Sequence, residues 1–224
     1  SEMCIRDRIK EADRKQVSQG VVQIAMVGGT IAFGYNKPGC ELQLTQQQAV
    51  EVATGGISDW KELGCEAGTI TWVHRSDGSG TTYNFTKHLS AISPEWKSDV
   101  GANKSVRWPT GVGAKGNEGV AAQLTQIDGG IGYVELAYVK GDLKAAAIQN
   151  GSGDKVLPTN ATANRALGSI DLGPDLIGSN ANPMDGYPIV TFTWVLAYAN
   201  GNGNKTGLLK STFDYMLSEE SQAK

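Results

Sequence analysis

Segments with the character of a β-strand alternate with segments with the character of a helix along most of these 224 residues. The strand-like segments are rich in apolar and β-branched residues, and they cover residues 20–27, 30–36, 69–74, 130–136 and 188–199. The helix-like segments repeat apolar residues at helical spacing, and they cover residues 45–55, 59–64, 81–89, 117–126 and 206–221. This alternation predicts an α/β fold. The pair Gly28–Gly29 predicts a bend between the first two strands, and the polar residues 150–164 predict a loop.

The overall charge argues against one class of partner. The net charge is −3 at pH 7, so the chain lacks the basic surface that nucleic-acid-binding proteins carry. The longest apolar stretch, Val21–Tyr35, is shorter than the ~20 residues that a membrane-spanning helix requires. We therefore predict a globular protein that binds no nucleic acid and that holds any anion by local geometry, since its global field is mildly repulsive.

The first eight residues, Ser1–Arg8, have neither an apolar period nor a helix cap, and we expect them to be a non-native leader. Of the three cysteines, Cys4 lies in this leader, which leaves Cys40 and Cys65. Neither belongs to a Cys-x-x-Cys pair or lies near a histidine cluster, so we expect no metal and no cofactor. The two cysteines are either free thiols or a disulfide, which would stabilise the protein by ~3 kcal/mol in an oxidising compartment.

The segment "TITWVHRSDGSGTTYNFTKHL" places an arginine, hydroxyl residues and glycines where a strand turns into a helix. The first amides of a helix are unpaired and attract anions. Gly80 allows the backbone to approach a ligand closely, and Ser79 and Thr81 add hydroxyl donors. Arg75 supplies a planar fork that suits two oxygens of a tetrahedral oxyanion. These residues predict a binding site for an oxyanion.

Asp77 is the unexpected member of this loop, because a carboxylate repels an anion. It fits the site if it orients the Arg75 guanidinium, or if it accepts the proton that phosphate retains at neutral pH and that sulfate lacks. A purely structural alternative stays open, in which Ser79 caps the helix, Asp77 makes a turn and Arg75 is a surface charge.

Two catalytic interpretations fit the segment less well. A nucleotide-binding P-loop requires Gly-Lys-Ser/Thr after its glycines, and no lysine follows here. A nucleophile elbow requires glycine two residues before the serine, and Asp77 holds that position relative to Ser79. His74 precedes the loop and His88 lies ~10 Å or more beyond the helix start, so neither is placed to activate Ser79. The sequence therefore favours binding over catalysis.

Three blocks resemble the phosphate-binding proteins of bacterial high-affinity phosphate ABC transporters. They cover residues 73–90 (the anion-binding segment), 106–139 and 187–198. The resemblance implies a two-lobed periplasmic-binding-protein fold of type II, with phosphate held between the lobes. It also implies a monomeric, periplasmic or extracellular protein that is not an enzyme and that delivers phosphate to the permease of an ABC transporter.

The resemblance also implies roles for individual residues. Arg75, Ser79, Gly80 and Thr81 would contact phosphate, Asp77 would hold Arg75 in place, and Cys40 and Cys65 would form the disulfide of an exported chain. The remaining alternatives are a binder of another tetrahedral oxyanion, such as sulfate or molybdate, a hydrolase of phosphate esters, and an adhesive module.

The chain departs from this family in its first part, because an early glycine-rich loop with further phosphate ligands has no counterpart here. We therefore expect an incomplete first lobe. Residues 9–36 would be its remnant and the crossover, residues 37–140 would form lobe two with the anion-binding loop, and residues 141–224 would return to lobe one. Because part of the site would be missing, we expect weak phosphate binding by this chain.

Overall fold

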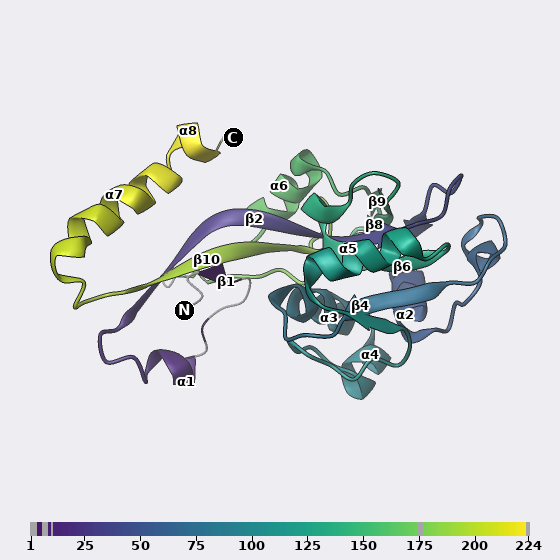
Figure 1. The fold of residues 1–224 in the computed structure, drawn as a ribbon, viewed down its shortest axis with the longest axis horizontal. Helices are drawn as coiled ribbons and strands as arrows, with labels where there is room; N and C mark the ends of the chain where they lie inside the picture. The colour runs from purple at the N-terminus through teal and green to yellow at the C-terminus, as the bar shows by residue number, and fades with distance from the viewer. Residues whose placement is uncertain (1–3, 6–8, 10, 174–176, 223–224) are drawn as a thin grey trace. The chain divides into compact units, whose positions relative to one another are not determined.

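The computed structural model describes residues 4–5, 9, 11–173 and 177–222 (Figure 1). The chain divides into two compact units. Unit 1 consists of Ser1–Gly28, Asp171–Gly178 and Phe192–Lys224, and unit 2 consists of Gly29–Ile170 and Ser179–Thr191.

The predicted boundaries of the lobes stay predictions. Unit 2 contains predicted lobe two, residues 37–140, and also residues 141–170. Of the predicted leader, residues 1–8, the structure describes only Cys4–Ile5. These two residues form β1, which pairs antiparallel with β10 (Val190–Tyr198). The rest of the leader lies outside the described residues.

Unit 2 contains a mixed sheet with helices on both faces. Its sheet has the order β2-β6-β4-β5, in which β4 runs parallel to β5 and β6 and β2 runs antiparallel to β6, and β7 also pairs with β2. A second, small sheet has the order β3-β8-β9. The strands are β2 (Val21–Tyr35), β3 (Gln43–Leu44), β4 (Thr71–Arg75), β5 (Val112–Ala114), β6 (Gly130–Glu135), β7 (Lys144–Ala145), β8 (Ala147–Gln149) and β9 (Lys155–Val156). The helices are α2 (Gln46–Thr54), η1 (Trp60–Leu63), α3 (Gly80–Ile92), α4 (Pro94–Asp99), α5 (Gly116–Gln126), η2 (Leu136–Tyr138) and α6 (Asn160–Gly168).

Strand β2 is continuous from Val21 to Tyr35, so the predicted bend at Gly28–Gly29 is wrong. Glycine permits a bend but does not enforce one, and neither glycine has a positive φ. From Ile31 onward the strand pairs with β6. The first part of β2 is also less buried than we predicted, because the side chain of Val27 is 54% exposed.

The helices begin and end where their capping residues predict. Thr45 forms a capping box at the start of α2, and Gly55 ends that helix in the left-handed conformation with φ of 82°. The loop predicted at residues 150–164 is wrong at β9 (Lys155–Val156) and in its last part, where α6 begins. Thr159 forms a capping box with Thr162 at the start of α6, and Ala166 is completely buried. Capping and packing therefore stabilise a helix here despite the polar composition of the segment.

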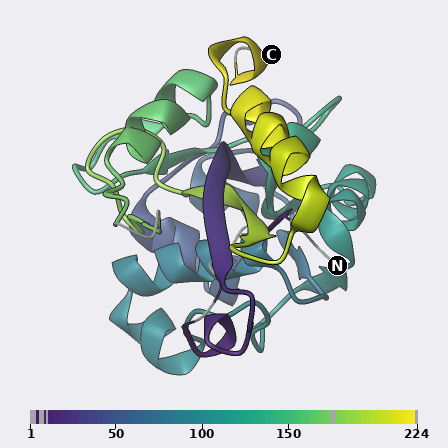
Figure 2. The same ribbon diagram turned by 90° about the vertical axis from the view of Figure 1, so that its left-hand side faces the viewer.

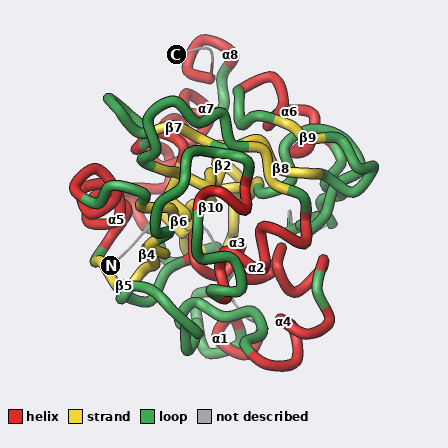
Figure 3. Tube along the Cα trace, turned by 90° about the vertical axis from the view of Figure 1, so that its right-hand side faces the viewer, coloured by secondary structure: helices red, strands yellow, loops and turns green. Residues whose placement is uncertain are grey.

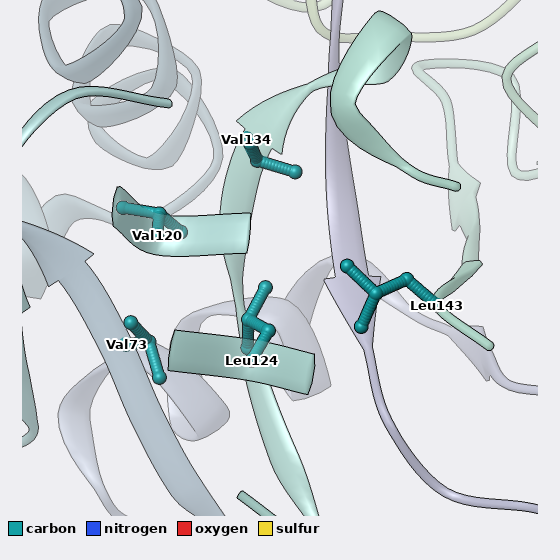
Figure 4. Packing of buried hydrophobic residues seen from close by; sticks show 5 residues of the cluster. All are labelled: Val73, Val120, Leu124, Val134 and Leu143. Atoms are coloured by element: carbon teal, nitrogen blue, oxygen red, sulfur yellow. The ribbon is translucent and has the colours of Figure 1, made fainter. Parts of the chain in front are cut away.

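Alternate residues of β4 face the two helical layers of unit 2. Val73 belongs to a buried cluster that lies between the strands and α5, together with Val120, Leu124, Val134 and Leu143 (Figure 4). The neighbouring residue Trp72 packs its ring against Phe85 of α3 instead, with 5.8 Å between ring centroids. Because successive side chains of a strand point to opposite faces, α5 and α3 cover opposite sides of the sheet. Helices α2 and α4 lie beside α3 (Figure 3).

Cys40 and Cys65 form a disulfide, with their Cα atoms 5.5 Å apart and a sequence separation of 25. A cross-link that closes a loop of this length lowers the entropy of the unfolded chain, which contributes about 3–4 kcal/mol to stability. We expect the variant Cys40→Ser/Cys65→Ser to lose about this much free energy of unfolding in urea titrations. Wild-type protein measured in a reducing agent serves as the control. Equal stability of oxidised and reduced wild-type protein would contradict the prediction.

Unit 1 contains fewer buried apolar side chains than unit 2. Its elements are β1, α1 (Glu11–Arg14), the first part of β2, most of β10, η3 (Gly203–Lys205), α7 (Thr206–Met216) and α8 (Glu219–Gln222). Figure 2 shows α7 and α8 at the end of the chain. The sequence predicted this amphipathic helix with an apolar side formed by Leu208, Leu209, Phe213, Met216 and Leu217. The helix is confirmed over Thr206–Met216, and α8 follows after a break, but no residue of α7 is buried, and Leu208 is 71% exposed.

Candidate oxyanion-binding site

The predicted site lies where β4 ends and α3 begins. Strand β4 is an inner strand that runs parallel to both its neighbours. Ligands of α/β proteins commonly bind beyond the carboxyl ends of such strands. Arg75 is the last residue of β4, and four residues later Ser79 is the N-cap of α3. The loop between them is fixed by backbone hydrogen bonds from Ser76 N to Ala114 O (3.0 Å) and from Ser79 N to Lys104 O (2.9 Å).

Arg75 and Asp77 form a two-pronged ion pair. Arg75 Nε donates to Asp77 Oδ1 at 2.7 Å, and Arg75 Nη2 donates to Asp77 Oδ2 at 2.6 Å. The Arg75 side chain is nearly buried, with 9% exposed, whereas that of Asp77 is 31% exposed. The hydrogen bond from Arg75 holds the pKa of Asp77 well below its usual range, and a hydrogen bond from the Gly116 amide (3.1 Å) acts in the same direction. Burial by itself would lower the pKa of Arg75, but the hydrogen bond and charge of Asp77 outweigh it and raise that pKa.

This geometry supports one of the two roles considered for Asp77. Both of its carboxylate oxygens accept hydrogen bonds, and the carboxyl group stays ionised at neutral pH. Asp77 therefore orients Arg75, and a proton on a bound phosphate would find a poor acceptor in it. The guanidinium has five N–H donors, of which Asp77 occupies two. Within the described residues, no hydrogen bond occupies Nη1 of Arg75, so that nitrogen remains available to a ligand.

The first turn of α3 supplies two further donors. Ser79 Oγ accepts a hydrogen bond from Thr82 N at 3.3 Å, so Ser79 does cap the helix. A hydroxyl group can accept and donate at the same time, and the Ser79 proton therefore remains available to an acceptor. Gly80 N is one of the amides that a helix leaves unpaired, and no hydrogen bond from it occurs in the described part of the chain. Thr81, which is 1% exposed, also interacts within the protein, and its predicted contact with phosphate stays a prediction.

Tyr133, which the sequence did not indicate, contacts both the end of β4 and the first turn of α3. Its hydroxyl oxygen accepts from Arg75 N at 3.1 Å and forms a hydrogen bond with Thr82 Oγ1 at 2.7 Å. Burial raises the pKa of Tyr133 to about 12, so the hydroxyl stays protonated. The register could have indicated this role, because Gly132 pairs with Val73 and the next residue of β6 therefore lies beside the end of β4.

Neither histidine lies where it could activate Ser79, as we predicted. His74 Nδ1 lies 3.1 Å from Arg75 O, and its ring stacks on Trp108. His88 Nδ1 lies 2.7 Å from Ala181 O. Both contacts with carbonyl oxygens require that Nδ1 carries the proton and donates it. In the described residues, no group of three His, Cys, Asp or Glu side chains is arranged to hold a metal ion.

The burial of His88 predicts a pH-dependent stability. The side chain is 1% exposed, and burial lowers its pKa to about 4. Between pH 6.5 and 4 the unfolded chain therefore binds more protons than the folded protein. The free energy of unfolding should decrease as the pH falls through this window, by roughly 3 kcal/mol from His88.

Urea titrations at pH 7 and pH 4.5 test this prediction. The variant His88→Asn keeps a donor for Ala181 but does not titrate, so its stability should change less between the two pH values. The variant His74→Asn is the control for the second histidine. A pH dependence in His88→Asn equal to that of the wild type would show that His88 is not responsible.

In the described part of the chain, no helix is both long and apolar enough to cross a bilayer.

Comparison with known proteins gives relatives for nearly the whole chain. The family model described as "PBP superfamily domain" matches residues 4–220. The phosphate-binding protein PstS of Xylella fastidiosa strain Temecula1 is 40% identical over 174 residues, which cover 71% of this chain and 48% of that protein. The phosphate-binding protein PstS of Haemophilus influenzae is 37% identical over 217 residues, which cover 89% of this chain and 65% of that protein. The chain thus spans between about half and two thirds of the length of these relatives.

The chain is also similar to a protein named as a phosphatase and to a solved structure. Alkaline phosphatase L of Pseudomonas aeruginosa is 29% identical over 182 residues, which cover 76% of this chain and 48% of that protein. The crystal structure of a DING protein matches with a TM-score of 0.79 at 21% identity, over 98% of this chain and 72% of that chain. At this identity the structural match shows the fold alone. The family match and the structural match confirm the predicted α/β fold of the periplasmic-binding-protein type, and the chain belongs to the PBP superfamily.

Proposed function

We propose that this chain is part of a protein that captures inorganic phosphate outside the cytoplasmic membrane and passes it to the permease of an ABC transporter. The observation that carries the proposal is the Arg75 guanidinium, which Asp77 orients at two nitrogens while Nη1 stays available. Arg75 is the last residue of β4, and α3 begins just after it. The hydroxyl group of the N-cap Ser79 and the amide of Gly80 are further donors for an anion. The names of the Xylella and Haemophilus relatives agree with a phosphate ligand.

Two features support the proposed location and partners. The disulfide between Cys40 and Cys65 suits an oxidising compartment such as the periplasm. Capture followed by delivery requires a partner in the membrane, which we propose to be an ABC permease, and the capturing protein itself would act as a monomer. We propose a binding role rather than catalysis, because both histidines are directed at backbone carbonyl oxygens and away from a role as a base for Ser79.

Calorimetric titration of the chain with phosphate and with sulfate tests the proposal. We expect one phosphate ion per chain, held by the donors of Arg75, Ser79 and Gly80. Both oxygens of Asp77 accept hydrogen bonds from Arg75, so Asp77 is a poor acceptor for the proton that distinguishes phosphate from sulfate. We therefore expect the affinity for sulfate to be within about tenfold of that for phosphate, which corresponds to about 1.4 kcal/mol. No heat from phosphate at millimolar concentrations, or a sulfate affinity far above that for phosphate, would contradict the proposal.

A further inference from the structure

A second concave surface of unit 2 has the opposite electrostatic character. It is a groove of about 1260 Å³ between α2, α4 and the segment that leads to β5. Ile92, the last residue of α3, lines it, whereas the proposed oxyanion site lies at the first residues of the same helix. The twelve steps from Gly80 to Ile92, at about 1.5 Å each, place the two ends of α3 roughly 18 Å apart. The groove is therefore separate from the Arg75 site.

Acidic side chains dominate the charge of this groove. Glu51 of α2 and Glu95 and Asp99 of α4 line it, against one basic residue, Arg107. The hydrogen-bond donors that reach these carboxylates are neutral, namely Gln47 Nε2 to Glu51 (2.8 Å), Ser93 Oγ to Glu95 (2.9 Å) and Ser98 Oγ to Asp99 (2.6 Å). In the described part of the chain, no ion pair joins any of the three carboxylates to a basic side chain. The groove therefore repels an oxyanion and attracts a cation.

Part of the lining of the groove is apolar and aromatic. Trp108 is half-buried there, and its ring lies 5.9 Å from that of Trp96, which is also part of the lining. Val50 and Ile92 add half-buried aliphatic surface. A lysine or arginine side chain combines an apolar stem, which such a lining accommodates, with a cation that carboxylates and indole faces attract.

We propose that this groove docks a segment of a partner protein that presents lysine or arginine side chains between apolar ones. Charge complementarity identifies the occupant, because three carboxylates without a cationic partner in the described part of the chain line the same groove as tryptophan and aliphatic side chains. The volume exceeds the 300–1,000 Å³ that is usual for small-molecule sites, which favours a polypeptide segment over a free small cation. A second copy of this chain is a poor occupant, since the chain has a net charge of −3.

The test uses a blocked eight-residue peptide of alternating lysine and leucine, and a matched peptide of alternating glutamate and leucine. Each is titrated into the ¹⁵N-labelled chain and followed by NMR. We expect the lysine peptide to shift the indole resonances of Trp96 and Trp108 and the amides of α2 and α4, and the glutamate peptide to leave them unchanged. The variant Glu51→Gln/Glu95→Gln/Asp99→Asn keeps each hydrogen-bond acceptor, and it should weaken binding of the lysine peptide at least tenfold.

A matched variant separates a docking site from general charge attraction. Glu66→Gln/Asp128→Asn/Asp142→Asn removes the same number of exposed carboxylates outside the groove, and it should change the affinity for the lysine peptide less than twofold. Glu95→Gln alone, which is the mildest change, should weaken binding about threefold. Phosphate affinity should be the same in all variants, so this proposal and the proposed function can fail independently.

Four results would overturn the proposal. The control variant could weaken binding as much as the groove variant, or the glutamate peptide could bind as well as the lysine peptide. Spermidine could compete with the lysine peptide at equal concentration, which would identify the groove as a site for small cations. Sedimentation could show self-association that the groove variant abolishes, which would identify a second copy of the chain as the occupant.

Discussion

Replacing Arg75 by alanine is expected to lower the phosphate affinity of this chain on the order of 100-fold, because a hydrogen bond between charged groups contributes about 1.5–3 kcal/mol and more when buried. The substitution removes the guanidinium, which is nearly buried with 9% of its side chain exposed. It also leaves Asp77 without its main counter-charge close to the incoming anion. Calorimetric titration with phosphate, at constant ionic strength, measures the change.

Three further variants define the cause of this loss. Arg75→Ala/Asp77→Ala removes the repelling carboxylate as well, so it should recover part of the affinity that Arg75→Ala loses. Arg75→Lys keeps the charge but not the planar fork that pairs with Asp77, and it should bind with intermediate affinity. Arg165 also forms an ion pair with an aspartate, Asp185, at an exposed position (3.1 Å), so Arg165→Ala is the matched control. An equal loss in Arg165→Ala would show that general electrostatics, and not the proposed site, explains the effect.

Replacing Phe85 by alanine is expected to destabilise unit 2 by about 3–5 kcal/mol. Phe85 is completely buried, and its ring stacks on that of Tyr133 with 4.4 Å between centroids. It also packs against Phe33 at 5.1 Å and Trp72 at 5.8 Å. The substitution therefore leaves a cavity that three other large rings cannot easily fill. Urea unfolding monitored by tryptophan fluorescence measures the loss.

The same substitution should weaken phosphate binding, since Tyr133 holds the backbone of Arg75 and the side chain of Thr82. Phe213→Ala is the control, because Phe213 lies half-exposed on α7 in unit 1 and its loss creates no buried cavity. If Phe85→Ala unfolded at the same urea concentration as Phe213→Ala, the aromatic cluster would not be the main source of stability in unit 2.

Local signals in the sequence predicted much of the fold. Thr45 and Gly55 mark the two ends of α2, and the helical spacing over residues 81–89 predicted α3, whose buried residues include Thr82, Phe85 and Leu89. The errors occur where packing decides the structure. Gly28 and Gly29 permit a bend, but β2 is one continuous strand whose partner β6 is distant in the sequence. Asn160–Gly168 has the composition of a loop, and only its contacts show that Ala163 and Ala166 are buried.

The candidate site was visible in the sequence only in part, for the same reason. Arg75, Asp77, Ser79 and Gly80 are neighbours in the sequence, so their pattern was visible as a motif. Tyr133 lies on β6 and Gly116 at the start of α5. Because both residues are distant from Arg75 in the sequence, no local motif indicates their contacts with the loop. The sequence also left two roles open for Asp77, because only the geometry shows that both its oxygens are occupied. The disulfide between Cys40 and Cys65 stayed an alternative until their Cα atoms were found 5.5 Å apart.

An NMR titration of the ¹⁵N-labelled chain with phosphate tests the central claim most directly, because it reports on the proposed donors individually. We predict that the backbone amide of Gly80 and the side-chain N–H groups of Arg75 show the largest shifts, that they saturate together, and that Arg75→Ala abolishes the shift at Gly80. Saturating phosphate that leaves the Gly80 amide and the Arg75 side chain unchanged, while resonances elsewhere in the chain move, would contradict the assignment of this strand end and helix start as the anion site.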